Sequence, residues 1–255
     1  MKKWWIRRMG YFRDQEGILH RYFNEQGNWN SHLEKTKEVI EKTVSAIQNK
    51  SSVLVLGSGW LLDVPIEFLC NVFEKVYLVD IHHPVEIRKK NSKHKNIVWV
   101  EQDITGVSQQ IYRLAGKRKS NLAKDLKNLK ISPPNFKFEA DFIISVNILS
   151  QIDELVVHYL KRSNKIDSDV ITEFRKRIQE KHLLYLQKRN SLLVTDIEEV
   201  SYDRDMELKE SNPIIFTKLP EENKTEEWQW RFDTQMTYRR NFITFRNVNA
   251  YRFIP

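Results

Sequence analysis

The sequence predicts an α/β protein with a Rossmann-like, doubly wound and mostly parallel sheet. Three observations lead to this fold class. Short apolar runs, typical of strands buried on both faces, alternate with segments of helical periodicity over residues 51–200. A Gly-x-Gly sequence directly follows the first apolar run. Residues 226–253 alternate apolar and polar positions, which predicts a C-terminal antiparallel pair and about seven strands in all.

Length and composition favour one compact domain. The chain has 255 residues, 40% of them hydrophobic, which is enough for one substantial core. We expect residues 1–50 to form a helical lid or buttress and residues 51–255 the Rossmann-like domain. The single Cys70 excludes an internal disulfide, and the basic N-terminal stretch carries no apolar signal-peptide core. No apolar run reaches the roughly 18 residues of a membrane span. These features predict a cytoplasmic protein that does not associate with membranes.

The elements follow from periodicity. Residues 35–50 predict an amphipathic helix, with Asn30 or Ser31 as its cap. Further helices are expected over 64–73, 149–160 and 170–189, each between two apolar runs. Parallel strands are expected near 53–57, 76–80, 97–101, 141–146 and 192–197.

A basic stretch spans residues 113–130, with seven basic residues and one acid. It suggests either a phosphate-contacting patch or a solvated helix, and leucines at helical spacing favour the helix. The net charge of +8 is otherwise spread along the chain. The stretch lacks the interleaved aromatic residues of a single-strand-binding surface, so nucleic acid is disfavoured as a partner.

The strand ends carry the candidate binding residues. Gly57, Ser58 and Gly59 end the first strand, where bare backbone lets a ligand approach and helix amides can meet an anion. Asp80 ends the second strand, at the separation from the glycines that delivers a carboxylate to ribose hydroxyls. Asp103 follows the third strand, from where its carboxylate can reach the amino group of an adenine or its neighbourhood. Ile81 and Ile104 follow these two aspartates and complete the expected lining of an adenosine-shaped site.

The series "VLVLGSGWLLD", "VYLVDIHHP", "VWVEQDITG" and "ADFIISVNILSQ" resembles the class I S-adenosylmethionine-dependent methyltransferases. The resemblance covers residues 50 to 200, and more narrowly "GSGWLLDVP" with "GNWNSHLEKT" resembles an uncharacterised bacterial group. It implies S-adenosylmethionine as the cofactor. In that family an acid two residues before the first glycine contacts the methionine amino group, and a third glycine closes the loop. Val55 and Leu61 stand at these places, and Asp63 can take over the acidic role.

Polar residues after the fourth strand are the candidates for chemistry. Asn147, Ser150 and Gln151 follow that strand, where an acceptor would face the methyl group, although Asn147 or Ser150 can equally cap the next helix. His32 is a candidate base or substrate ligand. Asp196 ends the fifth strand and can line the same space. Methyl transfer needs positioning more than a strong base, so few polar groups are required.

No metal is expected, because His82 and His83 have no further ligands at suitable spacing. The acceptor is expected to be a small molecule or a protein side chain, because "SVNIL" differs from the Asn-Pro-Pro-Tyr type of motif found in nucleic-acid amino-methyltransferases. Two alternatives remain. Val55 and Leu61 favour a cofactor-binding protein without catalysis. The second alternative is a nicotinamide enzyme. The Gly-x-Gly-x-x-Gly fingerprint of such enzymes has a third glycine where this sequence has Leu62, which argues against this alternative.

Overall fold

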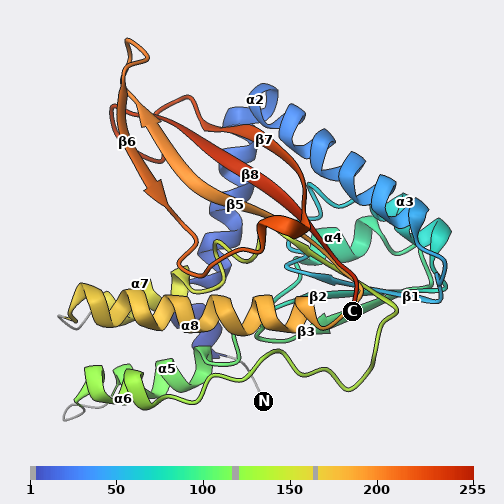
Figure 1. Ribbon diagram of the computed structural model, residues 1–255, viewed down its shortest axis with the longest axis horizontal. Helices are drawn as coiled ribbons and strands as arrows, with labels where there is room; N and C mark the ends of the chain where they lie inside the picture. Colours follow the sequence, from blue (N-terminus) through green and yellow to red (C-terminus); the bar gives the residue numbers. More distant parts are fainter. Residues whose placement is uncertain (1–3, 117–120, 163–165) are drawn as a thin grey trace.

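The computed structural model describes residues 4–116, 121–162 and 166–255, which form an open sheet with helices on both faces (Figure 1). The N-terminal half contains α1 (Trp4–Met9), α2 (Tyr11–Ala46), β1 (Ser52–Leu56), α3 (Ile66–Val72), β2 (Lys75–Asp80), α4 (Val85–Lys90), β3 (Ile97–Glu101), α5 (Ser108–Ala115) and α6 (Leu122–Asn128). The C-terminal half contains β4 (Phe142–Val146), α7 (Glu154–Lys161), α8 (Ser168–Gln187), β5 (Ser191–Tyr202), β6 (Leu208–Pro213), the 3₁₀ turn Glu221–Asn223, β7 (Lys224–Asp233) and β8 (Ile243–Phe253).

The sheet topology confirms the predicted fold class. Strands run in the order β3-β2-β1-β4-β5-β8-β7. The first five are parallel to one another, and β8 and β7 are antiparallel to their neighbours. The chain leaves β1 towards β3 on one side and returns to β4 on the other. The topological switch therefore lies between β1 and β4, where open α/β sheets bind their ligands.

Two hydrophobic cores cover the two faces of the sheet. Leu54 and Leu56 of β1 belong to the core under α5, α6, α7 and α8, whereas Val53 and Val55 belong to the core under α2, α3 and α4. The alternation follows from the period of two along a strand. All four side chains are at most 1% exposed, so this strand is apolar and buried from Val53 to Leu56.

The N-terminal helix is longer than predicted. The helix α2 is continuous from Tyr11 to Ala46, so Asn30 and Ser31 lie in its interior and do not cap it. Gly17 and Gly27 hid the helix from sequence reasoning, because each costs about 1 kcal/mol relative to alanine in a helix.

Tertiary packing offsets that cost. The Trp29 ring lies 4.8 Å from Trp230 of β7, and its Nε1 donates to the Phe232 carbonyl oxygen over 2.9 Å. One side of α2 is therefore fixed against the antiparallel part of the sheet.

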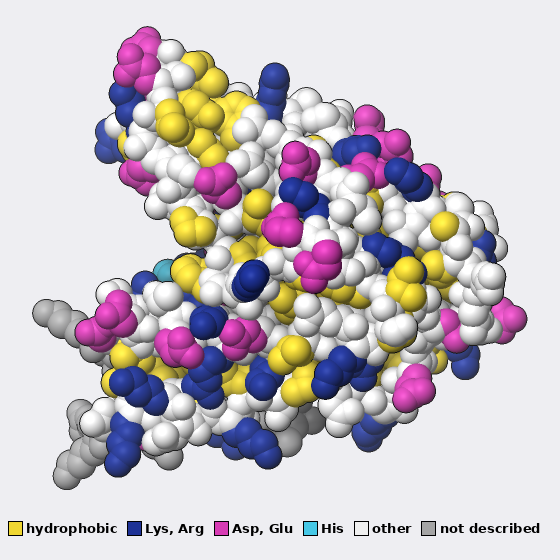
Figure 2. Space-filling model, in the orientation of Figure 1, with side chains coloured by type: hydrophobic (Ala, Val, Ile, Leu, Met, Phe, Trp, Pro, Cys, Tyr) yellow, Lys and Arg dark blue, Asp and Glu magenta, His cyan; other side chains and the backbone are white. Residues whose placement is uncertain are grey.

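The strand β6 was not predicted from the sequence. β6 pairs antiparallel with the outer half of β5, beyond the point where β4 ends. Its sequence, "LKESNP", has almost no buried position and includes a proline, so it lacks the usual strand pattern. Of the described basic residues in 113–130, Arg113 lies in α5, Lys124 and Lys127 lie in α6, and Lys130 follows α6. Residues 117–120, with three further basic side chains, lie outside the described part of the chain. Figure 2 shows Lys and Arg over the α6 and α8 face, interspersed with Asp and Glu.

None of the helices in the described ranges is both long and apolar enough to cross a bilayer.

Gly57 is required by packing inside the protein. Its φ is +76°, and a Cβ built on it would lie 2.8 Å from Cβ of Ile148 in the loop after β4. The close approach at this glycine is therefore made by the neighbouring loop. That contact sets the distance between the ends of β1 and β4.

The Gly57→Ala substitution is expected to lower the free energy of unfolding by about 2–4 kcal/mol, from left-handed backbone strain together with overpacking. The matched control is Gly27→Ala in the interior of α2, where a Cβ meets nothing within 4 Å. That change should stabilise the protein by up to about 1 kcal/mol. Urea unfolding of both variants measures the difference. Equal effects would contradict the assigned role of Gly57.

Candidate active site

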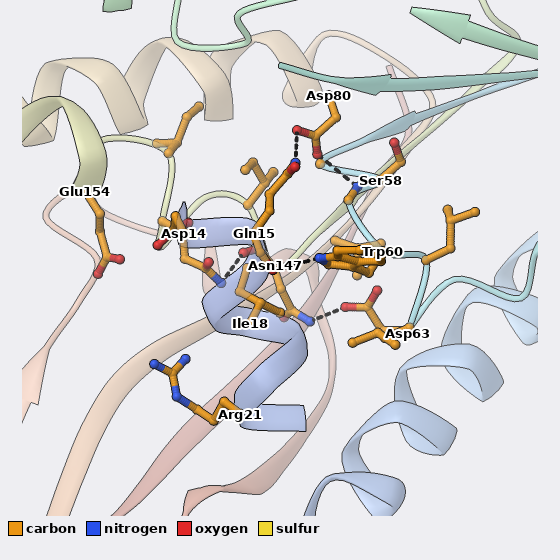
Figure 3. A pocket seen from close by; sticks show the side chains of 18 of the residues that line it. Asp14, Gln15, Ile18, Arg21, Ser58, Trp60, Asp63, Asp80, Asn147 and Glu154 are labelled. Carbon is orange, nitrogen blue, oxygen red and sulfur yellow. Dashed lines mark hydrogen bonds between the residues drawn. The ribbon is translucent and has the colours of Figure 1, made fainter. Parts of the chain in front are cut away.

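A cavity lies at the carboxyl ends of β1 to β4, closed on one side by the first half of α2 (Figure 3). Nearly all the residues predicted to form a site line it: Gly57, Ser58, Gly59, Asp63, Asp80, Ile81, Asp103, Ile104, Asn147 and His32. The exceptions are Ser150 and Asp196, which are hydrogen-bonded to each other in a buried network discussed below. Residues that are far apart in the sequence meet here because parallel strands end at one edge of the sheet.

Asp80 joins three segments of the cavity wall. Its Oδ2 accepts from the Gly59 amide over 2.9 Å, and its Oδ1 accepts from the Ile81 amide over 2.7 Å. Gln15 Nε2 of α2 also donates to Oδ1, over 3.2 Å. Burial raises the pKa of Asp80 to about 6, although backbone hydrogen bonds from Gly59, Ile81 and His82 lower it. The carboxylate thus holds the glycine loop, so a substitution here affects the fold as well as any ligand.

Leu61 keeps the backbone shape that a glycine would favour. Its φ is +55°, in the left-handed region that is uncommon for residues with a Cβ. The side chain is buried in the core under α2, which offsets the strain. Val55 is fully buried in the same core and presents no polar group to the cavity.

Asp103 lines the cavity and also shapes its own loop. Its Oδ1 accepts from the amide and hydroxyl of Thr105, and its Oδ2 accepts from the Ser108 amide at the start of α5. A carboxylate has about four acceptor positions, so one remains. The capping role and a ligand contact are therefore compatible.

Asn147 lies at the centre of the cavity with a strained backbone. Its φ is +48°, and it is 9% exposed. Its Nδ2 donates to Asp63 Oδ2 over 2.8 Å, whereas its Oδ1 has no hydrogen-bond partner. Burial raises the pKa of Asp63. Strain and an unpaired buried oxygen at one residue are features that cluster at functional sites.

His32 is buried in the interior of α2, because the helix begins at Tyr11 and not near residue 35 as predicted. Its ring stacks on Trp230 at 4.0 Å, its Nδ1 accepts from Trp228 Nε1, and its Nε2 lies 3.3 Å from Asn147 Nδ2. Burial lowers the pKa of His32 to about 3. The ring is therefore neutral at physiological pH and is a weak base. Because Nδ1 accepts from Trp228, the proton of the neutral ring is on Nε2, which faces the Asn147 side chain.

Ser150 does not line the cavity. It is 1% exposed, and its hydroxyl donates to Asp196 Oδ1 over 3.0 Å. Asp196 Oδ2 accepts from Arg246 Nη1 over 2.6 Å, and Glu199 accepts from Nη2 over 3.2 Å. Ser150 thus belongs to a buried ionic network behind the cavity, and we do not retain it as a catalytic candidate. Gln151, by contrast, lines the cavity and donates to the Asn147 carbonyl oxygen.

The outer half of the cavity was not found from the sequence. Asp14 and Arg21 come from α2, Glu154 from the first turn of α7, Tyr238 from the β7–β8 loop and Arg246 from β8. Figure 3 shows Asp14, Arg21 and Glu154 around one space. Glu154 is solvent-accessible but has protein on most sides, and this desolvation raises its pKa to about 7. No local pattern marks these positions, because they belong to separate elements.

Within the part of the chain that the structure covers, no group of three or more His, Cys, Asp or Glu side chains is arranged to hold a metal ion. The Nδ1 of His82 lies 3.4 Å from Glu101 Oε1, and the His82 ring packs against Phe12. The His83 Nε2 lies 3.0 Å from the Ser58 hydroxyl, which ties the glycine loop to the segment after β2.

No protein-family model matches the sequence, and no curated protein matches it. Solved structures similar to this chain include the N-methyltransferase NodS of Bradyrhizobium japonicum WM9 with S-adenosylhomocysteine, at 12% identity, 87% coverage of both chains and a TM-score of 0.40. A Burkholderia thailandensis 1,6-didemethyltoxoflavin-N1-methyltransferase is 10% identical, with 94% of this chain and 87% of the other covered and a TM-score of 0.42. An rRNA methylase of Streptococcus thermophilus is 9% identical, with 85% of this chain and 95% of the other covered and a TM-score of 0.33. At these values the similarity identifies neither a ligand nor an acceptor for this chain.

Asp196→Ala is expected to lower the free energy of unfolding by about 3–5 kcal/mol, because it leaves the Arg246 guanidinium buried with one carboxylate fewer. Glu226→Ala is the control: Glu226 also has two ion-pair partners, Lys35 and Lys42, but on the surface. Its loss should cost less than about 1 kcal/mol. Guanidinium unfolding of the two variants tests this. A small effect at Asp196 would show that the buried network is dispensable.

Proposed function

We propose that this chain is an S-adenosylmethionine-dependent methyltransferase. The main support is the Asp80 carboxylate, hydrogen-bonded to Gly59 and lining a cavity that extends to Asn147. A carboxylate after the second strand, beside a glycine loop after the first, is the arrangement that binds the ribose of an adenosine cofactor.

The space beside Gly59 fits that cofactor. Gly59 has a φ of +39°, and a Cβ built there would lie 3.8 Å from Asp80 Oδ2, in the space that ribose needs. Two ribose hydroxyls require two acceptor positions. The contact from Gln15 to Asp80, at 3.2 Å, is longer than those from the Gly59 and Ile81 amides, at 2.9 and 2.7 Å. We infer that Gln15 releases the carboxylate when the cofactor binds.

The other predicted residues divide between adenine and methionine. Asp103 and Ile104 are proposed for the adenine end, with Ile81 beside the ribose. Gly57 and Ser58 shape the loop. Asp63 is proposed to bind the methionine amino group in place of the missing acid at Val55, and the unpaired Oδ1 of Asn147 is a second acceptor for it or for the methyl acceptor. The left-handed backbone of Leu61 keeps the loop usable without a third glycine.

Bound S-adenosylmethionine supplies a methyl group on a sulfonium, from which an in-line nucleophile takes the carbon while the bonding electron pair stays on sulfur. The chain's own residues orient the acceptor and exclude water. Asn147 is proposed to position the nucleophile, with Asp63 holding the Asn147 amide. His32, the other candidate of this region, is proposed to contact the acceptor from beside Asn147. Glu154, with a pKa near 7, is proposed to accept the proton that the acceptor loses.

The acceptor is proposed to be a small molecule, in preference to a protein side chain or a nucleic acid. The cavity is lined from several sides by aromatic residues of α2 and β7, which suits a compact ligand. We retain residues 1–50 as a lid or buttress, since α2 supplies one cavity wall. We also retain the cytoplasm as the proposed compartment, because a chain with one cysteine has no internal disulfide of the kind common in secreted proteins.

Calorimetry with S-adenosylhomocysteine and NAD, side by side at pH 8, tests the proposal. We expect S-adenosylhomocysteine to bind and NAD not to bind. Asp80→Asn keeps the shape of the side chain but removes the charge, and should weaken binding about ten- to a hundredfold. Unfolding of the same variant measures its effect on the glycine loop. If the wild-type protein binds NAD, or binds neither compound, the proposal is wrong.

The pH dependence of binding follows from Asp80. Ribose hydroxyls donate to the ionised carboxylate, so below the pKa of about 6 a proton must leave before binding. Affinity for S-adenosylhomocysteine should therefore be constant from pH 8 to pH 7 and fall below pH 6 by up to about tenfold per unit. Asp80→Asn should bind weakly at every pH, without this fall. The same slope in both proteins would assign the titration to another group.

A further inference from the structure

The outer half of the cavity contains one guanidinium without an acceptor. Arg246 is held by Asp196 and Glu199. Arg21, which is half-buried, makes no hydrogen bond or ion pair with any residue in the described ranges. Its contacts are with ring faces: its Cζ lies 5.0 Å from the Phe232 centroid and 5.2 Å from the Tyr238 centroid. Stacking on rings leaves the in-plane N–H donors of an arginine free to bind.

Two further donors beside Arg21 lack partners. Trp230 Nε1 and Arg246 Nε are buried without a hydrogen-bond acceptor, and both residues line the cavity. Protein atoms cover both of these donors, so a ligand in the cavity does not reach them in this arrangement. Arg21 is half-buried, and it is therefore the donor that a ligand meets first. In Figure 3 its guanidinium points into the space shared with Asp14 and Glu154.

The approach to this space is also basic. A second, shallower pocket adjoins the cavity and shares Asp14, Arg21 and Glu154 with it. Its walls add Arg13, His158, Lys161 and Arg175, of which Arg175 is paired with Asp153. Asp14 and Glu154 are exposed carboxylates that oppose a negative ligand. Arg13, Arg21 and Lys161 outnumber them, even when the paired Arg175 is left out. The entrance thus carries a small excess of positive charge.

We infer that the methyl acceptor is a small organic anion whose carboxylate or phosphate binds Arg21. This inference rests on the proposed function, because it assigns the outer half of the cavity to the acceptor. Charge-assisted hydrogen bonds from a planar guanidinium to an oxyanion are strong and directional. They fix one end of a small molecule, so that the rest of it extends towards Asn147.

Ligand-observed NMR on the protein saturated with S-adenosylhomocysteine tests the inference. The probes are a fragment set of matched pairs: aryl and alkyl carboxylates with their primary amides, and phosphate monoesters with their parent alcohols. We expect the anionic members to bind at least about tenfold more tightly than their neutral partners. Whether the carboxylates or the phosphates lead identifies the acceptor's group.

Arg21→Gln should abolish the preference, and Arg21→Met should do so while keeping an apolar contact with the rings. Lys42→Gln, on the same helix but 73% exposed and paired with Glu226, should leave the preference unchanged. Absence of anion binding by the wild-type protein, or a preference that survives in both Arg21 variants, would overturn the inference. The affinity for S-adenosylhomocysteine, measured on each sample, separates the two proposals. If S-adenosylhomocysteine does not bind, the methyltransferase proposal fails. The same matched fragment pairs, applied to the protein without S-adenosylhomocysteine, then still decide whether Arg21 binds an anion.

Discussion

The Asp80 carboxylate is the interaction on which the candidate site depends. It is an acceptor for the glycine loop after β1, for the backbone after β2 and for the side chain of Gln15 on α2. Three segments that are distant in sequence are thereby held around one buried negative charge. Such a charge is costly unless donors surround it. The hydrogen bonds that stabilise this charge also hold the glycine loop in place. They leave the carboxylate oriented so that a ligand hydroxyl can replace one of its present donors.

The inner half of the cavity could be predicted from the sequence because local patterns specify it. Buried parallel strands are apolar along their whole length, so the runs ending at Gly57, Asp80 and Asp103 were recognisable. Parallel strands then bring those ends together without any knowledge of side-chain packing. The individual roles were less predictable. Gly57 is constrained by Ile148, and Asp103 is engaged with its own loop.

The outer half could not be predicted for a physical reason. Arg21, Glu154 and Arg246 lie on α2, α7 and β8, and each looks like an ordinary charged residue in its own segment. Their proximity depends on how α2 crosses the sheet, which is decided by the packing of Trp29 on the aromatic residues of β7. Long-range packing leaves no periodic signal in the sequence. The same reasoning explains why helix propensity understated the length of α2.

The length of α2 has a consequence for how the molecule folds. The hydrogen bond from Trp29 to Phe232 joins residues 203 positions apart, and β7 itself joins the sheet through β8. Contacts of such sequence separation form late, since the entropy of closing the chain must be overcome before they contribute. One wall of the cavity is thus completed near the end of folding. A small molecule held by that wall recognises only the finished fold, and its concentration will shift the balance between folded and unfolded chains.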